Sequence, residues 1–138
     1  MSYQTLIAEL VRKDGRYAYE AYEFIFAALA HTQKVLGRVP SADEAAASGP
    51  YHVSGRELVL GARELARREF GLMARVVFRL WGINRTDDIG EIVFTLVEGN
   101  LMSKTDHDTR SDFQDVFDLD RGLVEDFRIE LDEAEWTR

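Results

Sequence analysis

Residues 54–70 read SGRELVLGARELARREF and contain both a helix start and an apolar helix face. Ser54 and Glu57 have the S-x-x-E spacing of a capping box, in which the serine hydroxyl accepts from a backbone amide and the glutamate reaches back. The apolar residues that follow recur at helical spacing: Leu58, Val59, Ala62, Leu65, Ala66 and Phe70. This pattern predicts a helix over residues 54–70 with one buried side.

A second helix is predicted directly after this one. Gly71 interrupts the pattern, and the new helix runs from Leu72 to Trp81, where Gly82 provides a left-handed stop. Its expected inward side chains are Val76, Val77 and Leu80.

A third helix is predicted from Thr86, whose side chain can cap it. Its first turns hold Asp87, Asp88 and Glu91, which suit the positive end of the helix dipole. The buried face comprises Ile89, Ile92, Val93, Leu96 and Val97. Gly90 inside this helix costs about 1 kcal/mol relative to alanine, and a close approach by another helix is the expected compensation.

Upstream, two helices and one loop are predicted. A short helix buries Leu6, Ile7, Leu10 and Val11. Residues 18–36 form the most apolar helix, which should be the central core element because it is apolar nearly all round. Residues 37–50 hold both prolines and are predicted to be a surface loop or insertion.

Short strands complete the predicted fold. They are expected at 51–53, at 101–104 and at 127–131, while residues 113–119 fit either a strand or a short helix. The predicted fold class is therefore α+β and mainly helical, with about five helices and two or three short strands. At 138 residues the chain is predicted to be one globular domain, 1–138, whose residues 124–138 are an acidic C-terminal segment.

The order of these elements resembles a winged helix-turn-helix domain. Residues 81–86 resemble the turn between its two helices, 96–102 the end of its recognition helix, and 106–110 the tip of its wing. A winged-helix-like arrangement is accordingly expected, as an analogy at the level of the fold.

Most of the chain, from about Tyr3 to Leu123, also resembles a bacterial conserved hypothetical family of planctomycete and verrucomicrobial proteins. The resemblance lies in residues 22–25 (YEFI), 52–58 (HVSGREL), 81–83 (WGI), 90–94 (GEIVF), 103–105 (SKT) and 112–117 (DFQDVF). This family is of unknown function, so the resemblance implies no activity and no ligand.

Charge is distributed unevenly along the chain. Residues 1–53 carry a net charge of −1, residues 54–85 of +4 and residues 86–138 of −11, which together give the −8 of the whole chain. One interpretation is internal: the basic and acidic parts pack side by side and screen each other. The other is a polyanion-binding arginine face beside an acidic segment that competes for it.

The candidate polyanion-binding residues are arginines on the two helices of residues 54–81. Arg56, Arg63 and Arg67 stand at steps of seven and four, which places them on one helix face, and Arg75 and Arg79 repeat the four-residue step. The alternative is that these arginines are solvated and paired with the nearby glutamates Glu57, Glu64 and Glu69.

No familiar catalytic or cofactor motif is present. The chain has no cysteine and lacks G-x-S-x-G, G-x-G-x-x-G, G-K-[ST] and H-E-x-x-H. His52 and Ser54 have the residue types of a base and a nucleophile, but Ser54 already has a capping role. The aspartates of 106–120 offer oxygen ligands, yet a calcium loop starting at Asp118 has its glycine at the fifth position and Ile129 at the twelfth. No catalytic residue, metal or cofactor is therefore expected.

These observations favour a non-enzymatic protein–protein interaction module that binds an unidentified protein or a second copy of itself. The predicted helix 86–99 carries four acids and no lysine or arginine, so it would be repelled by DNA phosphates. The alternative function is a nucleic-acid-binding, winged-helix-like regulator that uses the arginine face. A cytoplasmic protein without membrane contact is expected, because no apolar run is long enough to span a bilayer.

Overall fold

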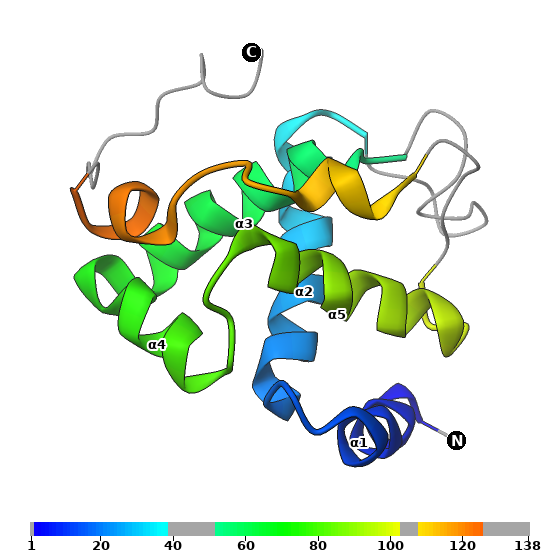
Figure 1. Cartoon of the computed structure of the whole chain (residues 1–138). Coiled ribbons are helices and arrows are strands. Elements are labelled where there is room, and N and C mark those ends of the chain that lie inside the picture. Colours follow the sequence, from blue (N-terminus) through cyan, green and yellow to red (C-terminus); the bar gives the residue numbers. More distant parts are fainter. Residues whose placement is uncertain (1, 39–51, 103–107, 126–138) are drawn as a thin grey trace.

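The computed structural model describes residues 2–38, 52–102 and 108–125, and the ordered elements of these ranges are all helical (Figure 1). The α-helices are α1 (Tyr3–Asp14), α2 (Tyr19–Val35), α3 (Gly55–Phe70), α4 (Ala74–Leu80) and α5 (Thr86–Glu98). Within the described ranges they are accompanied by the shorter helical turns η2 (Gly71–Met73), η3 (Arg110–Phe113) and the π-helical η4 (Arg121–Glu125).

The predicted central helix is confirmed as α2. It packs against α1, α3 and α5, and its Ala21, Tyr22, Ile25 and Ala28 are completely buried. Phe24 of α2 also gathers an aromatic cluster, with ring centroids 5.5 Å from Phe78 and 5.4 Å from Trp81. This cluster fixes α4 and the turn after it to the core, because large aromatic rings dominate the energetics of packing.

Helix α3 begins with the predicted capping box. The Glu57 amide donates to Ser54 Oγ at 3.1 Å, and the Ser54 amide donates to Glu57 Oε1 at 3.0 Å. In the middle of α3, a Cβ on Gly61 would lie 1.7 Å from Thr32 Oγ1 of α2. Only glycine therefore allows the two helices to approach this closely.

The start of α5 differs from the prediction. Arg85, not Thr86, occupies the N-cap position, and Asp88 Oδ2 accepts from the amides of Asn84 and Arg85 at 2.8 and 3.1 Å. Thr86 is buried, and its hydroxyl donates to the Phe113 carbonyl at 2.6 Å. The threonine hydroxyl therefore binds the backbone at Phe113, in the segment that follows α5, instead of capping the helix.

Phe113 is packed against two helical glycines. A Cβ on Gly55 of α3 or on Gly90 of α5 would lie 2.9 Å or 2.7 Å from atoms of the Phe113 side chain. Its side chain is 3% exposed, and η3 lies across α3 and α5 (Figure 1). The close approach expected at Gly90 is thus made by one aromatic side chain and not by another helix.

The predicted α+β class is wrong, because none of the residues 2–38, 52–102 and 108–125 belongs to a strand. Residues 52 and 53 have no strand partner, 101–102 form a bend after Asn100 (φ 61°), and 113–119 contain the end of η3 and turns around Asp115 (φ 47°). Phe113 and Leu119 are each buried in a core formed by helices. Their even spacing in the sequence is therefore not the alternation of a β-strand.

The winged-helix arrangement is not supported either, since a wing requires a hairpin of strands. Residues 103–107 and 127–131, where further strand or wing residues were predicted, lie outside the described ranges. Most of the predicted loop 37–50 does so too. At the ends of that gap, Arg38 Nη1 donates to the His52 carbonyl at 3.1 Å.

Candidate functional site

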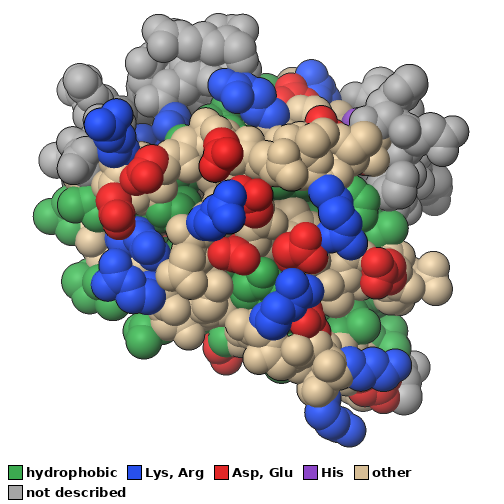
Figure 2. Space-filling model, viewed as in Figure 1, with side chains coloured by type: hydrophobic (Ala, Val, Ile, Leu, Met, Phe, Trp, Pro, Cys, Tyr) green, Lys and Arg blue, Asp and Glu red, His purple; other side chains and the backbone are tan. Residues whose placement is uncertain are grey.

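An exposed apolar stripe covers η2 and α4. Leu72, Met73, Val76 and Leu80 have exposed fractions of 63%, 58%, 39% and 77%. Val76 and Leu80 stand four residues apart and so share one side of α4, and Leu72 and Met73 precede them in η2. We call these four residues the η2–α4 face; in Figure 2, hydrophobic atoms lie at the left edge of the molecule, where Figure 1 places α4.

The backbone at Gly71 creates this face. Gly71 has a φ of 56° and ends α3, and the short turn η2 then redirects the chain into α4. Ala74 and Phe78 turn into the core and are completely buried. The residues on the other side of this seven-residue helix are left in solvent, so the prediction that Val76 and Leu80 lie inside is wrong.

The η2–α4 face is as large as the apolar patches that often serve as binding surfaces. From the exposed fractions, the four side chains present on the order of 400 Å² of surface, within the range of the largest patches on monomeric proteins, which are often functional. Phe78 and Ala74 hold the helix beneath it in place, which makes the face a preformed surface.

The five candidate arginines do not form one exposed face. Arg56 and Arg79 are exposed, whereas Arg63, Arg67 and Arg75 are half-buried. The Arg63 guanidinium lies over the Phe117 ring at 5.2 Å. Arg75 has a side chain only 12% exposed, and its Nε donates to Asp120 Oδ1 at 2.8 Å. The basic middle and the acidic end of the chain thus meet directly in this ion pair.

Two of the glutamates near these arginines have other partners. Glu57 accepts from Arg38 at 2.8 Å, and Glu64 lies 3.0 Å from His31 Nε2 and 4.0 Å from Arg68 Nε. Partial burial alone would raise the pKa of Glu57, but hydrogen bonds from Arg38 and Ser54 outweigh it and hold this pKa below its ordinary value.

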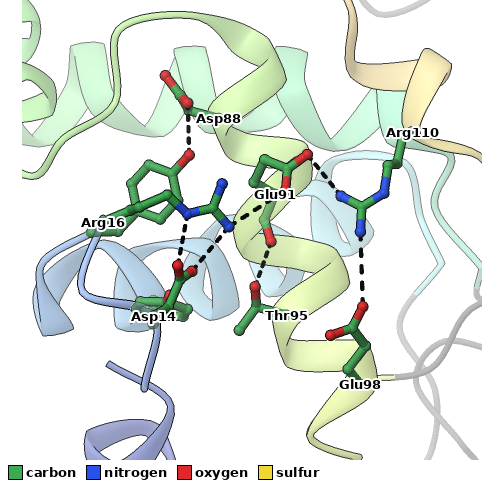
Figure 3. Close-up of polar contacts among 9 residues, drawn as sticks. Asp14, Arg16, Asp88, Glu91, Thr95, Glu98 and Arg110 are labelled. Atoms are coloured by element: carbon green, nitrogen blue, oxygen red, sulfur yellow. Dashed lines mark hydrogen bonds and ion pairs between the residues drawn. The ribbon is translucent and has the colours of Figure 1, made fainter. Parts of the chain in front are cut away.

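A cluster of ionisable groups joins the α1–α2 connection to α5 and η3 (Figure 3). Arg16 lies 2.7 Å from Asp14 and 3.5 Å from Glu91, while Arg110 lies 2.7 Å from Glu91 and 3.8 Å from Glu98. These pairs explain why α5 is acidic: its carboxylates face arginines of the same chain.

Two tyrosines belong to the same cluster. The Tyr17 hydroxyl donates to Asp88 at 2.6 Å, and the Tyr22 hydroxyl to Asp14 at 3.4 Å. Burial, together with the carboxylate that each hydroxyl faces, raises the pKa of Tyr17 well above its usual range and that of Tyr22 to about 12. Both phenols therefore stay protonated at neutral pH and serve as donors.

The described part of the chain offers no metal centre, since it contains no group of three or more His, Asp or Glu arranged to hold an ion. Of the predicted Asp-rich segment, Asp112 accepts from the Thr109 amide at 3.0 Å and Asp118 from the Asp120 amide at 2.9 Å. These aspartates cap turns. Asp106 and His107 lie outside the described residues.

His52 stands at the rim of a small apolar pocket. Its Nε2 lies 2.9 Å from Asp108 Oδ1, and Leu29, Leu58 and Phe113 contribute to the lining. The cavity volume of about 30 Å³ is enough for about one water molecule.

Compared with protein-family models, with curated proteins and with solved structures, the chain has no match. The resemblance to a planctomycete and verrucomicrobial family therefore stays a prediction. Among the described helices, none combines the length and the apolar character needed to cross a membrane.

Sequence reasoning missed the η2–α4 face although a signal for it was present. Residues 72–81 carry apolar side chains at positions 72, 73, 76, 77, 78, 80 and 81, which is nearly all round the helix. A helix of this kind must be buried on every side or expose part of its apolar surface. Because α4 lies at the periphery of the fold, the second outcome applies.

Proposed function

We propose that this protein is a non-enzymatic interaction module that binds another protein through the η2–α4 face. The observation that carries the proposal is the exposure of Leu72, Met73, Val76 and Leu80 on a helix whose other side is anchored by Phe78. Fully burying one such side chain is worth about 1.5–3 kcal/mol, so a few of them can dominate an interface.

The polar surroundings of the face suit a protein partner. Arg79 is exposed beside Leu80, and it pairs with no carboxylate among the residues that the structure describes. Exposed arginines next to apolar anchors are typical of interfaces. The other clusters of ionisable groups, around Glu91 and at His52, are occupied by internal pairs.

The proposal is tested by capture of a partner from native lysate with the immobilised full chain. Leu80→Glu places a charge at the most exposed apolar residue of the face and should abolish stoichiometric capture. Val35→Glu is the matched control, because Val35 is 41% exposed at the end of α2 and lies outside the η2–α4 face. Recovery of no stoichiometric partner, a second copy included, would count heavily against the proposal.

Nucleic-acid binding through Arg56, Arg63, Arg67, Arg75 and Arg79 is the weaker alternative. Counterion release requires cations that are free to meet phosphates, and Arg63 and Arg75 already contact Phe117 and Asp120. Fluorescence anisotropy with duplex DNA and single-stranded RNA distinguishes the two functions, because only the alternative predicts binding that weakens steeply with salt.

A further inference from the structure

We propose that residues 126–138 of this same chain bind back onto the η2–α4 face and cover it until a partner displaces them. The inference rests on the proposed function in that it takes this face as the binding surface of the protein. The inference further identifies which residues occupy that surface when no partner is bound.

The first argument is the point at which the segment begins. The last described residues belong to η4, which lies against α4 (Figure 1). Val124 of η4 is itself exposed, at 44%. Thirteen further residues can extend for up to about 40 Å, whereas the seven residues of α4 are about 10 Å long. The segment therefore starts from an element that packs against α4, and it is long enough to reach and run along the face.

The second argument is chemical complementarity. Residues 126–138 contain four large apolar side chains: Phe127, Ile129, Leu131 and Trp136. The segment as a whole also contains five acids against two arginines, which gives it a net charge of −3. The face offers apolar side chains beside the exposed cation Arg79, and Arg68 is a second exposed cation in the last turn of α3. The segment and the face therefore complement each other both in apolar side chains and in charge.

The third argument is size. A stable complex between two proteins buries about 800 Å² on each partner, roughly twice what the η2–α4 face presents. Any separate protein that met this face alone, a second copy included, would fall short of that area and would have to contact surface beyond the face as well. A tethered segment needs less contact, because its effective concentration at the face is in the millimolar range.

Disulfide trapping in the full-length chain tests the inference, and the absence of native cysteines removes any background. The probe is Leu80→Cys combined with Leu131→Cys, with Val76→Cys in place of Leu80→Cys as a second register. The matched control is Glu69→Cys with Leu131→Cys, since Glu69 is exposed just before Gly71 and outside the face. Oxidation at low protein concentration is followed by non-reducing gels and by mass.

We expect an intrachain disulfide to form about tenfold faster at position 80 or 76 than at position 69, because docking raises the local concentration of the segment. Adding Phe127→Ser and Trp136→Ser should return the rate to that of the control. Equal rates at all three positions would overturn the inference. A disulfide formed between two chains would overturn it as well and would make a second copy the occupant.

The same variants separate this inference from the proposed function. If no intrachain disulfide is favoured but Leu80→Glu still abolishes partner capture, the face binds a partner and residues 126–138 do not cover it. If the disulfide is favoured but Leu80→Glu leaves capture unchanged, the face serves the segment alone and the proposed function fails.

Discussion

Phe113 and Leu80 are both large apolar side chains at the end of a short helical element, yet one is 3% exposed and the other 77%. Phe113 enters a space that Gly55 and Gly90 leave open between α3 and α5. Leu80 projects from a helix that no described element covers on that side. Burial in this protein is therefore decided by the room that neighbouring helices leave, and less by the side chain itself.

The largest expected effect concerns the buried member of this comparison. Phe113→Ala removes the ring from its place between α3 and α5, and burial lost together with the remaining cavity costs about 3–5 kcal/mol of unfolding free energy. Chemical denaturation followed by circular dichroism measures this loss. A cost below 1 kcal/mol would mean that η3 contributes little to the stability of the core.

A smaller loss of stability is expected when a methyl group added at position 90 of α5 fills the space that the Phe113 ring occupies. A Cβ at position 90 would lie 2.7 Å from the Phe113 side chain, so Gly90→Ala should destabilise by about 1–3 kcal/mol despite its better helix propensity. In the double variant with Phe113→Leu the two costs should not add, because they share one contact. Additive costs would show that the clash is relieved elsewhere.

At the exposed member of the comparison the same kind of truncation should do almost nothing. Leu80→Ala is expected to change the unfolding free energy by no more than about 0.5 kcal/mol. Leu96→Ala is the matched control, since Leu96 is completely buried in α5 and its truncation should cost about 2–5 kcal/mol. Equal losses in the two variants would show that Leu80 is packed in solution.

Local signals in the sequence predicted the helices well. The capping box at Ser54 and Glu57 and the apolar length of residues 18–36 depend only on neighbours along the chain, and both were confirmed. Gly82, with a φ of 93°, is the left-handed stop that was predicted. In these places a few adjacent residues determine the conformation.

The strands and the exposed face could not be obtained in this way, because tertiary contacts decide them. Phe113 and Leu119 alternate as in a strand, but what places them is the space at Gly90 and the hydrogen bond from Thr86. Spacing likewise put the candidate arginines on one helix face, while the packing of residues 113–125 determined that Arg75 would meet Asp120.

The smallest predicted effect on the unfolding free energy is electrostatic. It concerns the ion pair at the start of α3, which is neither buried like Phe113 nor exposed like Leu80. Glu57→Gln keeps a side chain that can cap the Ser54 amide but removes the charge that Arg38 pairs with. For this partly exposed pair the loss at neutral pH should stay below about 1 kcal/mol.

Its pH dependence has a definite sign. The pKa of Glu57 is lower in the folded chain than its ordinary value of 4.5. The charge therefore stabilises the fold fully above that value, and this contribution is lost as the pH falls through the folded pKa. Denaturation of both proteins between pH 7 and pH 3 should give stabilities that converge toward the acid end. If the difference in stability between the two proteins stays constant with pH, the charge of Glu57 does not contribute. The difference would then come from the shape of the side chain, which glutamine does not fully reproduce.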